Sequence, residues 1–198
     1  AHRRYGKTVG VVNDLIRTAM TSNKPDTRCA YIAPFYSQAK AIAWDYAKFY
    51  SAPIPGIKVN ESELRIDYPT GARLRLFGAD NYDAMRGLYF DDAALDEPAD
   101  FPPNAWPMVI RPALADRQGR ATFMGTPKGK NEFWDIHEYA ASSPEWFSMV
   151  LKASQTGILP QDELDEARRA MGDDRYEQEF ECSFEAAILG AYYGKEMR

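Results

Sequence analysis

The sequence predicts an α/β fold with a mainly parallel central sheet that is flanked by helices. Three observations support this fold class. First, a loop with phosphate-binding spacing opens the chain and runs into an amphipathic helical segment. Second, short apolar segments typical of buried strands alternate with further helical segments. Third, two of these apolar segments end in polar residues, and an open α/β sheet places its ligand site at such strand ends.

Length and composition limit the class of protein. The 198 residues suit one domain, or one domain with a small appendage. The 45% apolar and 13% aromatic residues can form a sizeable core, which excludes wholesale disorder. No run of 18 apolar residues and no signal-peptide pattern occurs, so we expect a soluble protein without a membrane partner. Cys29 and Cys182 are expected to be reduced thiols, and with His2 and His137 they allow no zinc framework.

The charge is unevenly distributed along the chain. Its 24 basic and 29 acidic residues give a formal net charge of −5. Residues 1–48 carry eight basic and three acidic side chains, whereas residues 161–185 carry three basic and ten acidic ones. Because the acidic surplus is concentrated near the C-terminus, the total charge neither indicates nor excludes binding to nucleic acid.

The first motif is the opening segment AHRRYGKT, with the spacing A-x-x-x-x-G-K-T and alanine in place of the usual first glycine. Gly6 would let the backbone approach phosphate oxygens, and Lys7 would place its charge on the outer phosphates. The Thr8 hydroxyl is suited to ligate Mg²⁺. The alternative for the motif alone is a chance Gly-Lys-Thr.

The segment after this loop favours the phosphate-binding interpretation. Val9 to Thr21 has apolar residues at helical spacing and is followed by Asn23-Lys24-Pro25, which ends a helix. A helix N-terminus directly after the loop is favourable for phosphate. No strand precedes the loop, although such loops need one, so we expect the first strand to lie upstream of Ala1.

The segments that follow predict further strands and a helix. Arg28 to Pro34 is expected to be a buried strand, and Tyr36 to Tyr50 an amphipathic helix. Val59 to Ile66 and Arg73 to Phe77 alternate as the two strands of an antiparallel hairpin would. The expected core face of the helix, for which a ligand platform is the alternative, consists of Ala39, Ile42, Ala43, Tyr46 and Phe49.

Arg73 and Arg75 share one face of their predicted strand. A solvated face is favoured there over a contact with DNA.

The second motif is YFDDAALDE, from Tyr89 to Glu97. It predicts a strand that places Asp96 and Glu97 at its C-terminal end, where one carboxylate can hold Mg²⁺ through water and the next can act as general base. An isolated Asp-Glu would be a surface pair, but after a phosphate loop it indicates a site. Asp91 and Asp92 suit an exposed start of this strand rather than a buried one.

The third motif is ATFMGTP, from Ala121 to Pro127. The proline ends the strand and leaves Thr126 at its tip, where a hydroxyl can sense a γ-phosphate. Without the other two motifs, Gly-Thr-Pro would be no more than a turn.

The set AHRRYGKT, YIAP, RGLYFDDAALDE and MGTPKGKNEFWD resembles the large terminase subunit of tailed bacteriophages. That protein is an ATP-driven DNA-packaging motor with an N-terminal ATPase and a C-terminal nuclease. The resemblance implies a P-loop NTPase with a helicase-like additional-strand core over residues 1–155. Residues 156–198 would be a lid subdomain and the start of a linker, and Leu159 to Glu181 would form a small helical lid with Pro160 at a helix start and a break at Met171-Gly172.

The resemblance also implies roles for individual residues. Thr8 and Asp96 would hold Mg²⁺, and Glu97 would be the catalytic base. Thr126 would be the centre of a motif that couples hydrolysis to movement. The residues that would bind the nucleotide are Arg3, Arg4, Tyr5, Gly6, Lys7 and Thr8.

Three arginines are candidates to neutralise charge in the transition state. Arg4 would act within the chain, as would its neighbour Arg3, whereas Arg86 would act on the nucleotide of an adjacent subunit. The alternative for Arg86 is that it caps a turn or pairs with Asp83 or Asp91.

The expected cofactors are ATP and Mg²⁺. The expected partners are double-stranded DNA, the portal protein, the small terminase subunit and further copies of the chain in a ring on the procapsid, in the host cytoplasm. An adenine-binding segment would precede Ala1, and the nuclease residues would follow Arg198. The alternatives are another P-loop NTPase, helicase-like or a kinase, and an inactive docking fragment. The kinase is disfavoured because Asp-Glu together with Gly-Thr-Pro fits activation of a water molecule better than binding of a phosphate acceptor.

Overall fold

The computed structural model describes residues 1–2 and 4–185. These residues pack as two compact units, one formed by residues 6–124 and the other by residues 1–5 together with residues from 125 onward. Contacts within the chain therefore divide it after Met124, and the functional division expected at residue 155 stays a prediction.

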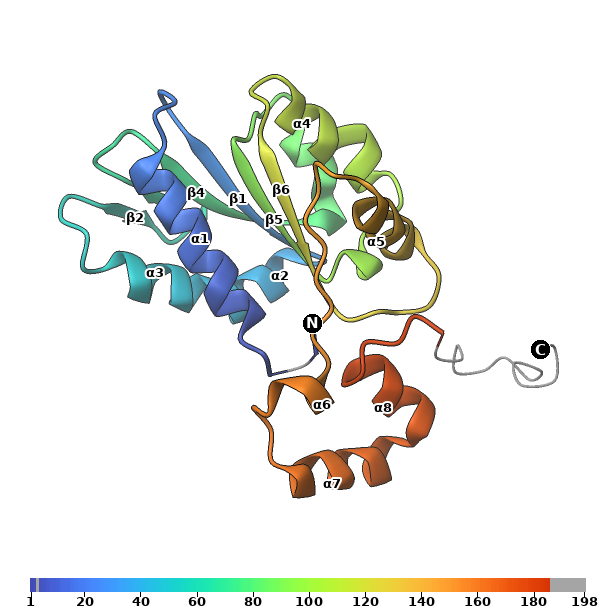
Figure 1. Cartoon of the computed structure of the whole chain (residues 1–198). Helices are drawn as coiled ribbons and strands as arrows, with labels where there is room; N and C mark the ends of the chain where they lie inside the picture. The colour runs from blue at the N-terminus through green and yellow to red at the C-terminus, as the bar shows by residue number, and fades with distance from the viewer. Residues whose placement is uncertain (3, 186–198) are drawn as a thin grey trace. The chain divides into compact units, whose positions relative to one another are not determined.

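The unit of residues 6–124 is built on a six-stranded sheet in the order β2-β3-β4-β1-β5-β6 (Figure 1). The four strands β4, β1, β5 and β6 are parallel, and β3 and β2 continue the sheet in antiparallel fashion. The mainly parallel sheet is therefore confirmed. The strands are β1 (Arg28–Ala33), β2 (Lys58–Asn60), β3 (Arg65–Asp67), β4 (Arg73–Gly78), β5 (Asp92–Asp96) and β6 (Arg120–Met124).

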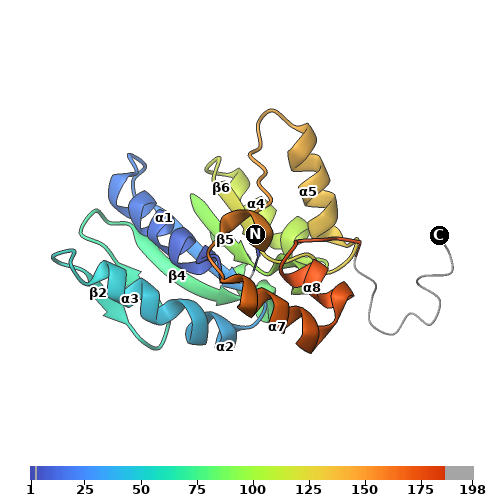
Figure 2. The ribbon, with the colours of Figure 1, turned by 60° about the horizontal axis from the view of Figure 1, so that its bottom comes forward.

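Helices cover both faces of this sheet (Figures 1 and 2). On one face lie α1 (Lys7–Thr21), α2 (Tyr36–Ala39), the π-helix η1 (Lys40–Trp44) and α3 (Asp45–Ser51). On the other lie the 3-10 helix η2 (Ala79–Met85), the π-helix η4 (Trp106–Ile110) and α4 (Arg111–Ala115); the 3-10 turn η3 (Pro98–Asp100) follows β5. Alternation along each strand assigns Tyr31 and Ala94 to the α1 face, and Ile32 and Leu95 to the opposite core.

The predicted core face of the helix from Tyr36 is confirmed for Ala39 and Ala43 and wrong for its three larger residues. Ile42, Tyr46 and Phe49 are exposed, Phe49 at 70%. The buried residues are Ala39, Ala43, Trp44, Ala47 and Ser51. The π-helical stretch η1 explains the difference, because its wider turns bring every fourth residue onto the same face. The small side chains at that spacing then pack on the core, and the side chains of Ile42, Tyr46 and Phe49 are exposed to solvent.

The predicted hairpin is correct in its pairing but not in its first strand. β3 pairs antiparallel with β4, and Ile66 is in register with Leu74. The segment expected as one strand is divided into β2 and β3 by a turn. The Asn60 side chain accepts hydrogen bonds from the backbone N–H groups of Ser62 and Glu63, which stabilises this turn.

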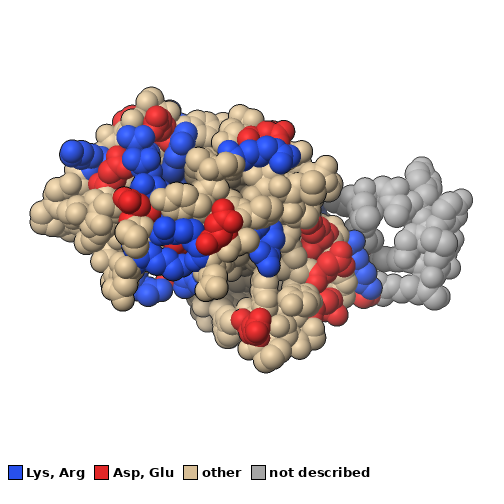
Figure 3. All heavy atoms as spheres, turned by 90° about the horizontal axis from the view of Figure 1, so that it is seen from above, with Lys and Arg blue, Asp and Glu red and all other residues tan. Residues whose placement is uncertain are grey.

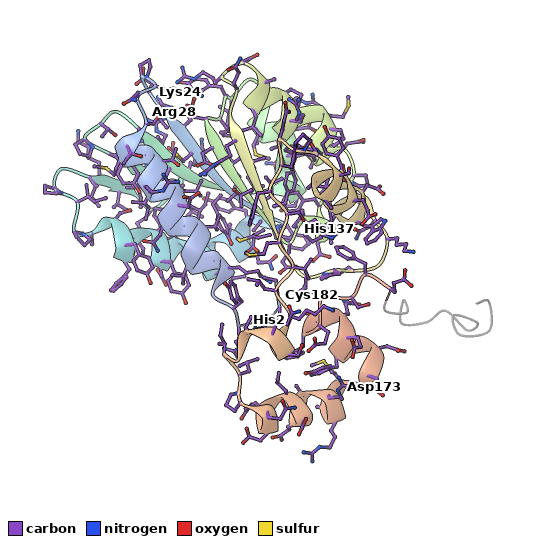
Figure 4. All side chains as sticks on the ribbon, viewed as in Figure 1. His2, Lys24, Arg28, His137, Asp173 and Cys182 are labelled. Atoms are coloured by element: carbon purple, nitrogen blue, oxygen red, sulfur yellow. The ribbon has the colours of Figure 1, made fainter. Side chains whose placement is uncertain are left out.

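Asp91 and Asp92 are buried, so the expected exposed strand start is wrong. Asp91 accepts from the Arg28 backbone N–H at 2.9 Å, and Asp92 accepts from the Thr18 hydroxyl at 2.7 Å. The basic side chains that pair with the two carboxylates are Lys24, Arg117 and Arg120. Because buried carboxylates need such partners, this network explains how two acids begin a core strand. Figure 4 labels Lys24 and Arg28 at this end of the sheet. Figure 3 shows the molecule from the same end, where basic and acidic side chains are interleaved on the surface.

Arg73 and Arg75 are partly exposed, so the solvated face expected for them is confirmed in part. The Arg73 Nε lies 2.6 Å from Asp67, and the Arg75 guanidinium lies over the Phe77 ring at 5.0 Å. Both arginines line a cavity of about 140 Å³. The alternative of a DNA contact at these residues stays a prediction.

The other unit contains the helices α5 (Glu132–Ser142), α6 (Ala153–Thr156), α7 (Gln161–Met171) and α8 (Asp173–Glu179). α7 begins after Pro160, and Gly172 separates it from α8, as predicted. A small core of Ala153, Leu164, Tyr176 and Phe180 joins α6, α7 and α8. Among the residues described, no helix is long and apolar enough to cross a membrane.

The chain start packs into this second unit. The His2 backbone N–H donates to the Leu151 carbonyl at 2.9 Å, and the His2 ring nitrogen Nε2 lies 2.8 Å from the Thr156 hydroxyl. The Cys182 thiol also reaches the Leu151 carbonyl, at 3.2 Å, and Figure 4 labels both His2 and Cys182. Cys29 and Cys182 are both free, buried thiols.

Candidate functional site

The candidate site in the unit of residues 6–124 lies where the first turn of α1 meets the C-terminal ends of β1 and β5. The parallel register of these strands places their C-terminal ends at the same edge of the sheet. Lys7 and Thr8 come from α1, Tyr31 from β1, and Asp96 and Glu97 from the end of β5. Thr8 and Glu97, the last residues of two motifs and 89 positions apart in the sequence, thus belong to one site, as the order of the motifs in the chain predicts.

Gly6 directs the chain into α1 through a left-handed conformation with φ 85° and ψ 20°. A residue with a side chain would be strained there, so this turn requires glycine. Within the described residues, no side chain caps the N-terminus of α1. Its first backbone N–H groups and the helix dipole are therefore suited to an anion.

Lys7 and Glu97 face each other across the site. The Lys7 Nζ lies 3.6 Å from the Glu97 Oε1, and their side chains are 14% and 23% exposed. A lysine in this position can place its positive charge on a phosphate, and it also contacts the carboxylate of the candidate base.

Glu97 follows directly on the buried Asp96 at the end of β5. Its backbone is left-handed, with φ 51° and ψ 53°, and its N–H donates to the Met124 carbonyl of β6 at 2.8 Å. Such a conformation costs about 1–3 kcal/mol in a non-glycine residue and is found most often at functional sites. The strand end thus holds two adjacent carboxylates in different settings, Asp96 in the core and Glu97 beside Lys7.

Burial raises the pKa of Asp96 above its usual value, and the charge of Glu97 adds to this effect. The Tyr31 phenol donates a hydrogen bond to Asp96 Oδ2, which favours the ionised carboxylate, as does the charge of Lys7. Burial and the Asp96 charge in turn raise the pKa of Tyr31, so the phenol stays protonated and remains a donor.

Sequence reasoning did not identify Tyr31 as part of the site. It placed the residue only inside a buried strand. The available signal was a hydroxyl-bearing side chain in an otherwise apolar strand, which needs a hydrogen-bond partner once it is buried.

The donor set is suited to a magnesium ion that arrives with phosphates. Mg²⁺ is commonly held by one or two carboxylates together with substrate phosphates and water. Thr8 and Asp96 would supply a hydroxyl and a carboxylate. Over the described part of the chain, no group of three or more His, Cys, Asp or Glu side chains forms a metal cage of its own. A shared protein–nucleotide site is the arrangement that these ligands fit.

Arg86 does not join these residues within its own unit. It follows η2, and its Nε pairs with Asp83 at 2.6 Å, while its side chain is 55% exposed. The pairing with Asp83 was the alternative expected from the sequence. A role towards an adjacent subunit stays a prediction.

Three further candidates belong to the second unit. Arg4 and Tyr5 are exposed, and Arg4 has a left-handed φ of 66°. Thr126 is buried and follows the end of β6 by two residues, so the predicted strand end before it is confirmed. Arg3 lies outside the described residues. The roles of these four residues stay predictions.

Comparisons with known proteins agree with this fold. The large terminase subunit of Escherichia phage T5 is 26% identical to the chain over 167 residues, which cover 81% of this chain and 38% of that protein. The large terminase ATPase domain of Thermus phage P74-26 matches with a TM-score of 0.80 and 22% identity, over 92% of this chain and 86% of that one. No protein-family model matches the chain.

A further solved structure carries a nucleotide analogue. The large terminase of a thermophilic bacteriophage in complex with ATP-γ-S matches with a TM-score of 0.70 and 14% identity, over 92% of this chain and 46% of that one. The chain spans 38% of the length of the T5 protein. The resemblance expected from the motifs is confirmed: the chain is similar in sequence to phage large terminase subunits and has the fold of their ATPase domains.

Proposed function

We propose that this chain is the ATP-hydrolysing part of a phage large terminase, which drives double-stranded viral DNA into a procapsid. The observation that carries the proposal is the approach of Lys7 to Glu97 at 3.6 Å, with Thr8 and Asp96 beside them. A phosphate-binding helix start and two strand-end carboxylates are the parts that hydrolysis of a nucleoside triphosphate needs. The ATP-γ-S complex of the thermophilic-phage terminase supports the choice of nucleotide.

Each side chain has a separate task in this proposal. Lys7 and the N–H groups at the start of α1 bind and orient the outer phosphates. Thr8 and Asp96 hold Mg²⁺, which when bound neutralises charge on the phosphates. Glu97, whose carboxylate lies 3.6 Å from the Lys7 ammonium, accepts a proton from the attacking water.

The remaining roles extend the proposal beyond this group of residues. Arg3, Arg4 and Tyr5 would complete the nucleotide-binding loop, with Arg4 neutralising transition-state charge. Thr126 would be the centre of the motif that couples hydrolysis to movement. The portal protein, the small terminase subunit and a ring of further copies on the procapsid would be partners in the host cytoplasm. The helices α7 and α8 would serve as the lid.

Phosphate release tests the proposed activity. The chain, and a version extended at its N-terminus by the upstream coding sequence, are mixed with ATP and Mg²⁺, with and without double-stranded DNA. We expect steady release of inorganic phosphate from the extended version without any added acceptor. Transfer to a small-molecule acceptor instead of water would indicate a kinase. No release from either version would support a docking fragment and contradict the proposal.

Arg86 is proposed to act on the nucleotide of the adjacent subunit. The residues that follow it, Gly87 to Phe90, line a cavity with Arg28 and Cys29 at the start of β1. That edge of the sheet is opposite to the end that carries Asp96. Arg86 is exposed, and the residues that follow it lead to this opposite edge. Its own nucleotide site is therefore a poor target, and the site of a neighbouring subunit is a better one.

Mixed assemblies test this role. We expect Arg86→Ala subunits and Glu97→Gln subunits to be inactive separately and to regain part of the ATPase activity when mixed, because some interfaces then join an intact arginine to an intact glutamate. Asp83→Asn is the matched control, since it removes the ion pair but keeps the arginine. If mixing restores nothing while both variants assemble, or if Asp83→Asn is equally inactive, Arg86 has a structural role.

A further inference from the structure

Tyr31 carries a buried hydroxyl that the proposed reaction does not yet use. The residue lies in the middle of the sheet, fully buried, in register with Leu76 of β4 and Ala94 of β5. Both neighbours are apolar, so a phenylalanine would satisfy the packing at this position. A phenol in such surroundings is stabilised only if its oxygen has a hydrogen-bond partner.

The neighbours of this hydroxyl come from both candidate motifs. The phenol donates a hydrogen bond to Oδ2 of Asp96. The Thr8 side chain is near enough to lower the pKa of Tyr31, against the larger effect of burial. Tyr31 is therefore bonded to the end of β5 and lies near the first turn of α1.

The register explains why this contact forms. Tyr31 and Ala94 are paired across β1 and β5, and both contribute to the core on the α1 side of the sheet. Asp96 is two residues beyond Ala94 on the same strand, so alternation places its side chain on that same side. A tyrosine at position 31 is long enough to span this offset.

We propose that Tyr31 is a positioning residue that holds the Asp96 carboxylate in the arrangement needed to receive Mg²⁺ with the nucleotide. The inference rests on the proposed function, because it assigns Tyr31 to that same site. Tyr31 touches neither metal nor nucleotide in this proposal and acts only through Asp96. Residues that orient metal ligands from behind in this way commonly contribute 10-fold to 100-fold to metal affinity or activity, as an order of magnitude.

The test measures binding rather than turnover. A fluorescent ADP analogue is titrated with Mg²⁺ on the full chain, for the unchanged protein and for Tyr31→Phe. We expect the Mg²⁺ concentration at half-maximal binding to rise roughly 10-fold or more in Tyr31→Phe. Binding of the analogue without Mg²⁺ should stay unchanged, because Lys7 and the start of α1 remain intact.

Tyr68→Phe is the matched control. Tyr68 is also buried in this unit, and its phenol bonds to the Ser51 hydroxyl at 2.8 Å, so the variant loses a comparable buried hydrogen bond away from the site. We expect its Mg²⁺ dependence to equal that of the unchanged protein. An equal shift in both tyrosine variants, or no shift in Tyr31→Phe, would overturn the proposal.

A double-mutant cycle shows whether Tyr31 acts through Asp96. In the Asp96→Asn background, Tyr31→Phe should shift the Mg²⁺ dependence no further, because the group that it positions has already been replaced. This background also removes the buried charge, which keeps the comparison possible if Tyr31→Phe alone does not fold. Full additivity of the two shifts contradicts positioning. Absence of Mg²⁺-dependent nucleotide binding in the unchanged protein would count against the proposed function itself, a result distinct from failure of the Tyr31 proposal.

Discussion

Lys7→Ala is expected to reduce ATP hydrolysis by about 10²-fold or more while leaving the fold intact. Removing one group that stabilises developing charge in a water-excluded site commonly has an effect of this order. Lys7 is the first residue of α1, and its ammonium lies 3.6 Å from Glu97 rather than in either hydrophobic core of the unit. The side chain therefore contributes to the site and little to packing.

The measurement is the steady-state rate of phosphate release, with thermal unfolding recorded in parallel. Lys58→Ala is a suitable control, because Lys58 is an exposed lysine on the edge strand β2. We expect its turnover to be normal and both variants to unfold at nearly the same temperature as the unchanged protein. Near-normal turnover in Lys7→Ala would show that the opening loop is not a phosphate-binding loop.

The parts of this site that were predictable from sequence are those with a local pattern. The helix after Gly6 has apolar residues at helical spacing, and α1 has the predicted last residue, Thr21. The run before Asp96 is apolar and short, and β5 ends at the predicted carboxylate. Parallel strands that alternate with helices place such ends at one edge of a sheet, so the meeting of the two motifs followed from their order.

The features that were not predictable depend on residues far apart in the sequence. Asp92 appeared exposed because its partners Thr18 and Arg120 come from α1 and β6. The exposed face of the helix from Tyr36 depends on a π-helical stretch that hydrophobic spacing does not reveal. Tyr31 gains its role only when β1 and β5 are side by side. Periodicity reports which side of an element is buried, but not which buried polar groups meet.

Glu97→Gln and Asp96→Asn are expected to have different effects although the two residues are adjacent. Asp96 is buried and bonded to Tyr31, whereas Glu97 is partly exposed beside Lys7. Asp96→Asn removes the charge at the proposed Mg²⁺ ligand, so Mg²⁺-dependent nucleotide binding should weaken. Its amide oxygen can still accept from Tyr31, and the fold should be kept.

Glu97→Gln should retain nucleotide binding and lose hydrolysis by roughly 10²–10⁴-fold, the usual contribution of a general base. The amide fills the same space and accepts the same left-handed backbone, but it cannot take a proton from water. It also removes the carboxylate that lies 3.6 Å from Lys7, so the lysine loses a competitor for phosphate and nucleotide affinity should be equal or higher. Single-turnover hydrolysis and equilibrium binding of a fluorescent ADP analogue, measured on both variants, separate the two effects. If Glu97→Gln weakened Mg²⁺-dependent binding and Asp96→Asn abolished only the chemical step, the metal and base roles would have to be exchanged, and the left-handed conformation of Glu97 would then serve to present a metal ligand.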